Sequence, residues 1–183
     1  AAAESAEFMH DDAAGAVTRL VEMQIEPFLV RSSVIGVLAQ RLVRMLCPHC
    51  TVAYKPATFE LEQLGLDRAT LDWKARRELK GRYQPHDLEY QYIGQNLASD
   101  AIFYKPGGCD ACGGKGFLGR RGLYELMLVD DTVGPLILKN ADAQTIKKAA
   151  VIAGMDTLRD DGARKVILGL TTVEEVLAAK QED

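Results

Sequence analysis

The chain has 183 residues, of which 48% are apolar, and a formal net charge of -4 at pH 7. This length suits one domain, or one domain with a small satellite, and the composition suffices to bury a core. The acidic balance excludes a general attraction to nucleic acid or to an anionic membrane, although the 22 basic residues can still form a local patch. The longest apolar run, residues 33–46, is interrupted by Gln40, Arg41 and Arg44 and is too short to span a bilayer. We therefore expect no transmembrane segment and no secretory signal.

The first residues differ in composition from the rest of the chain. Residues 1–11 are small and polar and have no apolar period, so we interpret them as a vector-derived or disordered leader. From Asp12 onward apolar residues recur at helical spacing, which predicts a helix that ends near Pro27.

A second helix is predicted over residues 34–46, which are apolar on most sides, and either Ser32 or Ser33 is expected to cap it. In such a helix Arg41 and Arg44 share one face. Because a buried charge is costly unless it is paired, each arginine is expected to reach a surface, a carboxylate or a neighbouring subunit.

The middle of the chain predicts short elements separated by irregular segments. Residues 59–66 read as a short helix, and residues 102–105 and 122–129 as strands. Residues 66–100 are polar and mixed in charge, and a few aromatic residues are expected to anchor them. These anchors are Trp73, Tyr83, Tyr90 and Tyr92.

The last third of the chain predicts helices over residues 130–140, 143–153, 157–169 and 173–180. Asp142 is expected to cap the second of these helices and Gly154 to end it, because glycine accepts the left-handed backbone found at helix ends. Either Thr171 or Thr172 is expected to cap the last helix.

No catalytic constellation of Ser, His and Asp, and no pair of carboxylates suited to acid–base chemistry, stands out in the sequence. The acidic pairs at 130–131 and 160–161 are interpreted as helix-start and solvent-face charges. His49 is interpreted as an exposed turn residue, with ligation in place of a cysteine as the alternative. His10 and His86 have no partner that the sequence identifies.

The glycine-rich run CDACGGKGFLGRRGLYEL at residues 109–126 allows three interpretations. A P-loop requires Ser or Thr after its Gly-Lys pair, but Gly116 follows Lys115, and Cys109 stands where the first glycine should be. A thioredoxin-like redox pair would be a single Cys-x-x-Cys beside a βαβ unit, whereas two pairs occur and no such unit surrounds them. The third interpretation is half of a metal site.

Cys47, Cys50, Cys109 and Cys112 are all the cysteines of the chain, and they form two Cys-x-x-Cys pairs. Two such pairs are typical of a structural Zn²⁺ site with four sulfur ligands. Closing the 58-residue spacer between them costs roughly 3–4 kcal/mol of conformational free energy. The binding of structural zinc contributes roughly 10–16 kcal/mol, which exceeds this cost. The sequence therefore favours zinc, and disulfides stay open as the alternative.

Four segments resemble the assembly ATPases of bacterial type II secretion and their type IV pilus relatives. These segments are residues 13–23, 26–50, 109–127 and 155–177, and they cover nearly all of the chain outside the leader and the spacer. The segment beside the first cysteine pair, SSVIGVLAQRLVR, resembles the secretion branch of this family more than the pilus branch.

This resemblance implies a hexameric motor for protein transport, whose RecA-like domain binds ATP and Mg²⁺ as nucleotide and cofactor. It implies a cytoplasmic location, peripheral to the inner membrane, with neighbouring subunits and inner-membrane platform proteins as partners and no nucleic acid. The chain then corresponds to a predominantly α-helical C-terminal part of an α/β RecA-like ATPase, with a small α+β zinc module.

The resemblance also divides the chain and assigns residues. Residues 1–11 form the leader, 12–46 a helical ATPase region, 47–112 the tetracysteine module with its long spacer, and 113–183 a strand followed by helices. The four cysteines match the family's metal positions. Arg120 is implied near the nucleotide or a subunit interface, with a solvated hairpin charge as the alternative, and Arg41 and Arg44 are expected at an interface.

The sequence also departs from the family. The nucleotide-binding motifs that precede this region in the family do not occur, so this chain alone is not expected to hydrolyse ATP. Asp12 aligns with the end of the family's histidine motif, which places Met9 at the histidine and His10 out of register. A free-standing zinc adaptor for protein partners stays open, and so does a DnaJ-like chaperone module, which would need four repeats.

Overall fold

A computed structural model of the chain describes residues 12–66 and 102–181. The predicted leader and residues 67–101 of the spacer lie outside these residues, and so do His10, His86 and the expected aromatic anchors at positions 73, 83, 90 and 92. In the described part of the chain, no helix combines the length and the apolar character needed to cross a membrane.

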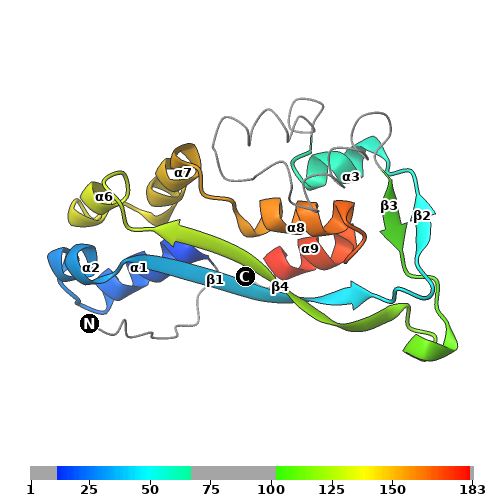
Figure 1. Ribbon diagram of the computed structural model, residues 1–183. Coiled ribbons are helices and arrows are strands. Elements are labelled where there is room, and N and C mark those ends of the chain that lie inside the picture. The colour runs from blue at the N-terminus through cyan, green and yellow to red at the C-terminus, as the bar shows by residue number, and fades with distance from the viewer. Residues whose placement is uncertain (1–11, 67–101, 182–183) are drawn as a thin grey trace, which may run out of the picture. The chain divides into compact units, whose positions relative to one another are not determined.

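The chain forms two compact units, each built from separate stretches of sequence. Among the described residues, the first contains 12–40 and 124–158, and the second contains 41–66, 102–123 and 159–181. Two long strands, β1 (Gly36–Leu46) and β4 (Phe117–Leu128), pair with each other, and each strand begins in one unit and ends in the other (Figure 1).

The first unit is mainly helical. It contains α1 (Ala13–Glu22), α2 (Pro27–Ser33), α6 (Gly134–Leu138) and α7 (Ala143–Ala153), with α1 packed against α7 and α2 against α6. The apolar sides of these helices and one face of the strands bury a common core, which supplies most of the favourable free energy of folding. The fully buried members of this core include Ala13, Ala14, Val17, Met127, Val133, Ile137 and Ile146.

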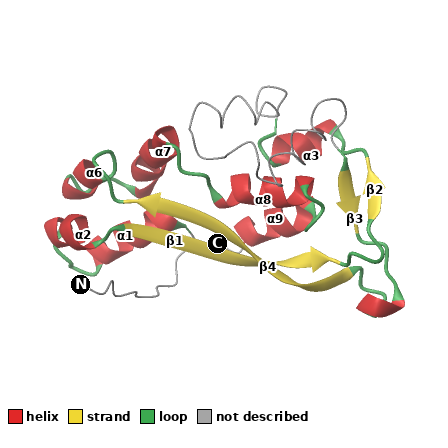
Figure 2. Cartoon of the chain, viewed as in Figure 1, coloured by secondary structure: helices red, strands yellow, loops and turns green. Residues whose placement is uncertain are grey.

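The second unit combines short strands with helices. It contains β2 (Val52–Tyr54), α3 (Thr58–Gln63), β3 (Phe103–Lys105), the 3-10 turn η1 (Asp110–Cys112) and α9 (Val173–Gln181), and all but the first residue of α8 (Leu158–Ile167). β2 and β3 are antiparallel, with Val52 opposite Lys105 and Tyr54 opposite Phe103. Figure 2 shows this mixture of helices and short strands.

The helix predicted over residues 34–46 is wrong, because this run forms strand β1. Ser32 and Ser33 are not its cap but the last residues of α2, and Pro27 begins that helix. An apolar run of this length fits a buried strand as well as a buried helix, and periodicity alone does not separate the two. Pairing with β4 decides the outcome here.

Most other predicted elements are confirmed. Helix α1 follows Asp12, whose carboxylate accepts a hydrogen bond from the Gly15 N–H at 2.7 Å. Asp142 caps α7 through the Thr145 N–H at 2.9 Å, and Gly154, with φ of 113°, ends that helix. Thr172 is the cap of α9, since its hydroxyl accepts from the Glu175 N–H at 3.4 Å.

One predicted surface charge is instead buried. Asp161 is only 7% exposed and forms ion pairs with Lys165 and Arg164 on the same helix, α8. Its interpretation as a solvent-face charge is therefore wrong. The matching lysine four residues later was the available signal, because residues i and i+4 meet on one side of a helix.

The predicted α/β class is confirmed, since the described residues form helices together with small two-stranded sheets. The division at residues 11, 46 and 112 stays a prediction about how the chain is organised for function.

Candidate metal centre

Two strand pairings bring the distant cysteine pairs together within the second unit. Cys50 precedes β2 by one residue, and Cys109 follows β3, so the β2–β3 ladder places the two Cys-x-x-Cys turns side by side. On the other side, the Cys47 N–H donates to the carbonyl of Gly116 at 2.9 Å, next to the start of β4. The chain thus returns to the same place after the spacer.

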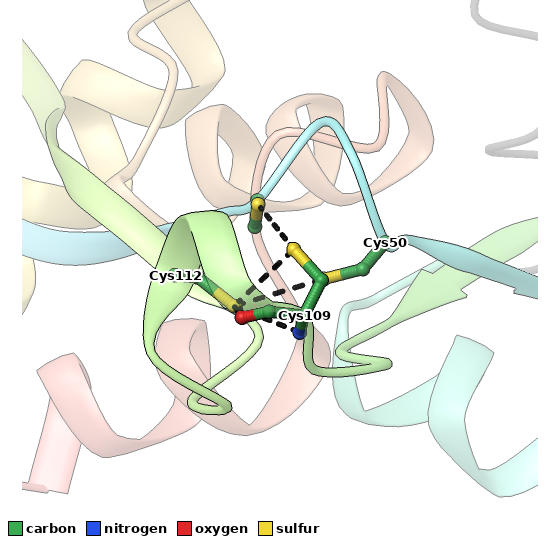
Figure 3. Close-up of side chains that lie close together, drawn as sticks. Cys50, Cys109 and Cys112 are labelled. Atoms are coloured by element: carbon green, nitrogen blue, oxygen red, sulfur yellow. Dashed lines mark hydrogen bonds between the residues drawn. The ribbon is translucent and has the colours of Figure 1, made fainter.

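The four sulfur atoms form one cluster, and all lie within 4.8 Å of one another. The Sγ–Sγ distances are 3.8 Å for Cys47–Cys109, 3.9 Å for Cys50–Cys112 and 3.8 Å for Cys109–Cys112. The cysteines are free thiols, and Figure 3 shows the labelled ones turned toward one another.

The sulfur spacing fits a tetrahedral zinc ion. With a Zn–S bond of about 2.3 Å, the edges of a regular tetrahedron are about 3.8 Å long, and this agrees with the three distances above. The four cysteines would therefore hold Zn²⁺ as a closed set of ligands, whose chemistry is to join the two turns rather than to activate a substrate.

Both cysteine turns have the same local geometry. In each, the N–H of the second cysteine donates to the carbonyl of the first at 3.2 Å, which folds Cys-x-x-Cys into one tight turn. Backbone N–H groups also point at the sulfurs: Gly108 donates to Cys50 at 3.2 Å and Gly116 to Cys112 at 3.1 Å. Such donors favour thiolates, the form in which cysteine binds metal.

The thiols differ in acidity for identifiable reasons. Hydrogen bonding from the Cys109 N–H is the main cause that lowers the pKa of Cys112 to about 6. Loss of solvation is the main cause that raises the pKa of Cys50 to about 11. Four sulfurs at this spacing repel one another as thiolates, so a divalent cation is the group that lets all four ionise together.

The glycines around the second cysteine pair serve the turn and not a phosphate. A side chain on Gly107 would place its Cβ 2.1 Å from the carbonyl oxygen of Cys50, so only glycine fits there. Gly116 has φ of 72°, a left-handed conformation that glycine adopts without strain. The glycine-rich run is therefore explained by the geometry of a tight metal-binding loop.

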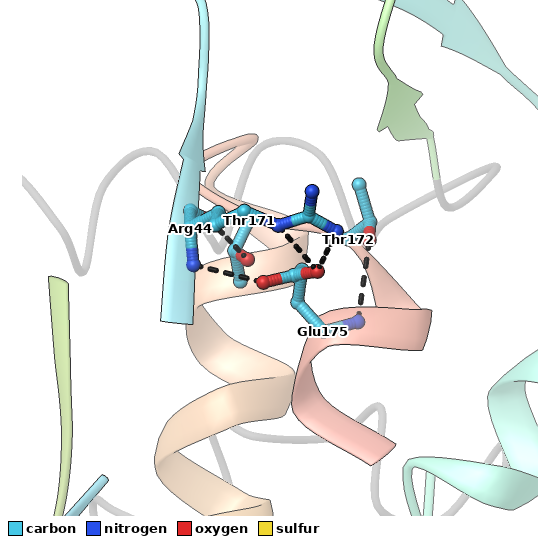
Figure 4. Close-up of polar contacts among 4 residues, drawn as sticks. All are labelled: Arg44, Thr171, Thr172 and Glu175. Carbon is cyan, nitrogen blue, oxygen red and sulfur yellow. Dashed lines mark hydrogen bonds and ion pairs between the residues drawn. The ribbon is translucent and has the colours of Figure 1, made fainter. Parts of the chain in front are cut away.

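Arg44 lies in a polar cluster of the same unit. Its guanidinium forms an ion pair with Glu175 of α9 and lies over the ring of Phe117, 4.3 Å from the ring centre. The Glu175 carboxylate also accepts from the Arg44 backbone N–H at 2.9 Å, and the Thr171 hydroxyl donates to the Arg44 carbonyl at 2.8 Å (Figure 4).

The acidity of Glu175 reflects this pairing. Burial is the largest influence and acts to raise the pKa of Glu175, but the hydrogen bonds and the charge of Arg44 together bring the pKa below its ordinary value. The cluster ties β1 to the last helix inside one unit, so the carboxylate expected for Arg44 is found within the chain itself.

The other predicted arginines and the histidine are dispersed. Arg41 is half-buried and, being three residues from Arg44 on a strand, points to the opposite face, which corrects the shared face expected for a helix. Arg120 and Arg121 are exposed on β4, and His49 is exposed in its turn. None of these residues joins the sulfur cluster; whether the arginines form an interface stays a prediction.

A buried carboxylate in the first unit was not singled out from the sequence. Glu125 is fully buried, and its two oxygens accept hydrogen bonds from the N–H groups of Ala13 at 3.1 Å and Leu158 at 3.3 Å. Lys147 lies 3.6 Å from Glu125 and 2.7 Å from Asp12. The sequence did carry a signal for Glu125. In the alternating pattern of this strand, Glu125 occupies a position where an apolar side chain is expected.

The chain is similar to known secretion and pilus proteins over most of its length. It is 42% identical over 168 residues to the type IV pilus assembly ATPase PilB of Thermus thermophilus. It is 41% identical over 170 residues to the type II secretion system ATPase E of Vibrio cholerae. It is 39% identical over 173 residues to the type II secretion system protein E of Pseudomonas aeruginosa. These matches cover 92–94% of this chain, 16% of the Thermus protein and 28% of the other two, so the chain spans less than a third of the length of these relatives.

The family relationship also appears in a direct match to a family model. The model described as type II/IV secretion system protein matches residues 8–178. This range includes both cysteine turns and nearly every described element. The chain therefore belongs to the type II/IV secretion system protein family.

Proposed function

We propose that this chain is the C-terminal, zinc-bearing portion of the ATPase that powers type II protein secretion. The observation that carries this proposal is the 41% identity to the type II secretion system ATPase E of Vibrio cholerae across 93% of the chain. The intact protein would bind ATP and Mg²⁺ in a RecA-like domain and act as a hexamer. It would work in the cytoplasm at the inner membrane, docked to platform proteins of the secretion system.

The zinc ion has a structural role in this proposal. Cys47, Cys50, Cys109 and Cys112 hold it, and the metal fixes the two turns to each other. The support is the sulfur spacing of 3.8–3.9 Å together with the backbone N–H donors around the cluster. Because all four ligand positions belong to cysteine, the ion has no open position for a substrate.

A pilus assembly ATPase is the second candidate, and a specific observation supports it. The Thermus thermophilus relative named as a type IV pilus assembly ATPase is 42% identical, against 41% for the Vibrio cholerae secretion ATPase. The sequence around the first cysteine pair is the reason for placing the secretion branch first. A free-standing zinc adaptor is the weaker candidate, since it would not require family similarity along nearly the whole chain.

A replacement experiment tests the proposal. This chain is fused in place of the matching region of the Vibrio cholerae ATPase E, and the chimera is introduced into cells lacking that ATPase. We expect restored secretion by the chimera and no ATP turnover by the isolated chain. The same chimera made in the Thermus pilus ATPase is the matched comparison between the two branches.

Two results would count against the proposal. ATP turnover by the isolated chain would exclude the idea that it depends on another part of a longer protein. Restored pilus assembly together with a folded but inactive secretion chimera would move the chain to the pilus branch.

A further inference from the structure

The four cysteine sulfurs differ in their access to solvent. Cys47 is fully buried and Cys112 is 7% exposed, whereas Cys50 and Cys109 are each half-buried. A small neutral oxidant such as hydrogen peroxide therefore meets Cys50 or Cys109 before the other two sulfurs. The susceptibility of cysteine to oxidation follows its exposure and its thiolate character, and cysteines that bind metal are thiolates. The cluster thus has an accessible side on which an oxidant can react.

Hydrogen bonding separates the two half-buried sulfurs. The Gly108 N–H donates to Cys50 at 3.2 Å, and such a donor draws electron density from a sulfur and lowers its nucleophilicity. The side-chain contacts of Cys109 are with two other sulfurs, those of Cys47 and Cys112, each at 3.8 Å (Figure 3). Cys109 is therefore the more reactive of the two sulfurs, and it has a possible disulfide partner on either turn.

The same reasoning selects the sulfur that completes a disulfide with Cys109. Cys112 accepts N–H groups from Cys109 at 3.3 Å and from Gly116 at 3.1 Å, so its thiolate is the weaker nucleophile. Cys47 lies at the same distance from Cys109 and belongs to the other turn. The favoured disulfide therefore crosses between the two turns. Cys50 and Cys112, 3.9 Å apart, are left as a second pair that also crosses between the turns.

We propose that Cys109 is an oxidation site for peroxide and that two alternative clasps join the cysteine turns. One clasp is the zinc ion, and the other is a pair of disulfides, Cys47–Cys109 and Cys50–Cys112. A dithiol reductant returns the disulfides to thiols, so the exchange is reversible. The inference rests on the zinc site of the proposed function, but it does not depend on secretion.

Each disulfide consumes one peroxide. The Cys109 thiolate attacks one peroxide oxygen, the O–O bond breaks and hydroxide leaves, which makes Cys109 a sulfenic acid. The Cys47 thiolate then attacks the Cys109 sulfur, the S–O bond breaks and a second hydroxide leaves. The two thiolates have lost two electrons, the peroxide has gained them, and two protons from solvent turn both hydroxides into water.

The first disulfide leaves an incomplete set of metal ligands. Cys50 and Cys112 alone supply two of the four sulfurs that a closed zinc site requires, so the chain releases its zinc. A second peroxide then oxidises Cys50 and Cys112 by the same two steps. The two turns stay joined throughout, because each disulfide contains one cysteine from each turn.

Peroxide titration of the reduced, zinc-loaded chain tests the proposal. A chromogenic zinc indicator measures the release, and we expect one zinc ion per chain to be free once two peroxides per chain have reacted. A dithiol reductant and added zinc should restore the starting zinc content. The matched control M23L removes a methionine of the first unit that is 54% exposed and also reacts with peroxide, and this variant should release zinc as the wild type does.

Peptide mapping without reductant identifies the disulfides. Trypsin leaves the first cysteine pair within residues 45–68 and the second pair within residues 83–115. Disulfides that cross between the turns join these two peptides, and tandem mass spectrometry should assign Cys47 to Cys109. Disulfides within each turn would leave two separate peptides, each lighter by two hydrogens. With less than one peroxide per chain, the sulfenic-acid reagent dimedone should label Cys109 first.

Thermal unfolding followed by circular dichroism compares the clasps. The oxidised, zinc-free chain should melt at a higher temperature than the reduced chain treated with a chelator, because disulfides restrict the unfolded chain. The proposal is overturned by separate peptides, by first labelling at Cys50, by an oxidised chain that keeps its zinc, or by equal melting temperatures. A reduced chain that takes up no zinc would refute the metal site and this inference with it. A failed secretion chimera would refute the proposed function and leave the oxidation site standing.

Discussion

Glu125 shows how one side chain can organise several distant segments. Its carboxylate lies fully buried in the first unit and accepts backbone N–H groups at the starts of α1 and α8, with Lys147 close by. The first N–H groups of a helix have no partner within that helix, and a carboxylate there is also favoured by the helix dipole. Glu125 therefore replaces solvent for groups that would otherwise be buried without partners.

Replacing Glu125 by alanine is expected to destabilise the chain by roughly 3–5 kcal/mol, since it leaves Lys147 and two backbone donors without this carboxylate. Chemical denaturation measures the loss. The variant E125Q keeps the shape and one acceptor and should lose less, whereas E22A, at an exposed position, should change stability by less than about 0.5 kcal/mol. Equal effects of E125A and E22A would mean that the buried carboxylate contributes nothing.

The helix caps, which act locally, were predictable from the sequence, whereas the buried carboxylate of Glu125, which acts over distance, was not. The caps at Asp12, Asp142 and Thr172 each satisfy a donor three positions ahead, so neighbouring residues suffice to identify them. Glu125 serves donors at residues 13 and 158, far away in the chain. Only the fold brings these groups together.

The metal-binding loop shows the same contrast at the scale of elements. Each cysteine turn could be identified from its spacing, and so could the pairing of two turns on one ion. Strand β1 could not, because an apolar run with Arg41 and Arg44 in it also suits a helix. Its strand conformation depends on hydrogen bonds to β4, which lies beyond the spacer. Long-range pairing overrides local preference here.

A pair of glycine substitutions tests whether the loop geometry holds the metal. Gly107→Ala brings a Cβ to 2.1 Å from the Cys50 carbonyl and should shift that turn, lowering zinc affinity by about 10–100-fold, as changes next to metal ligands do. Gly113→Ala meets nothing within 4 Å and adds only the strain of a left-handed backbone, about 1–2 kcal/mol. Competition with a zinc chelator compares the two, and equal affinities would contradict the proposed geometry.

At the scale of the whole molecule, the chain joins two units with different tasks in this account. The first unit buries a helical core around the carboxylate of Glu125. The second unit holds the cysteine cluster beside a basic strand. Family membership was predictable because the matching segments include both cysteine turns, whereas the extents of the two units depend on strands that pass from one to the other.

The central claim is that four cysteines from two distant turns bind one structural zinc ion. X-ray absorption at the zinc edge of the purified chain tests it most directly, together with the metal content of the same sample. We expect one zinc ion per chain, surrounded by four sulfur atoms at about 2.3 Å. A folded chain without zinc, or a zinc ion with nitrogen or oxygen among its ligands, would contradict it.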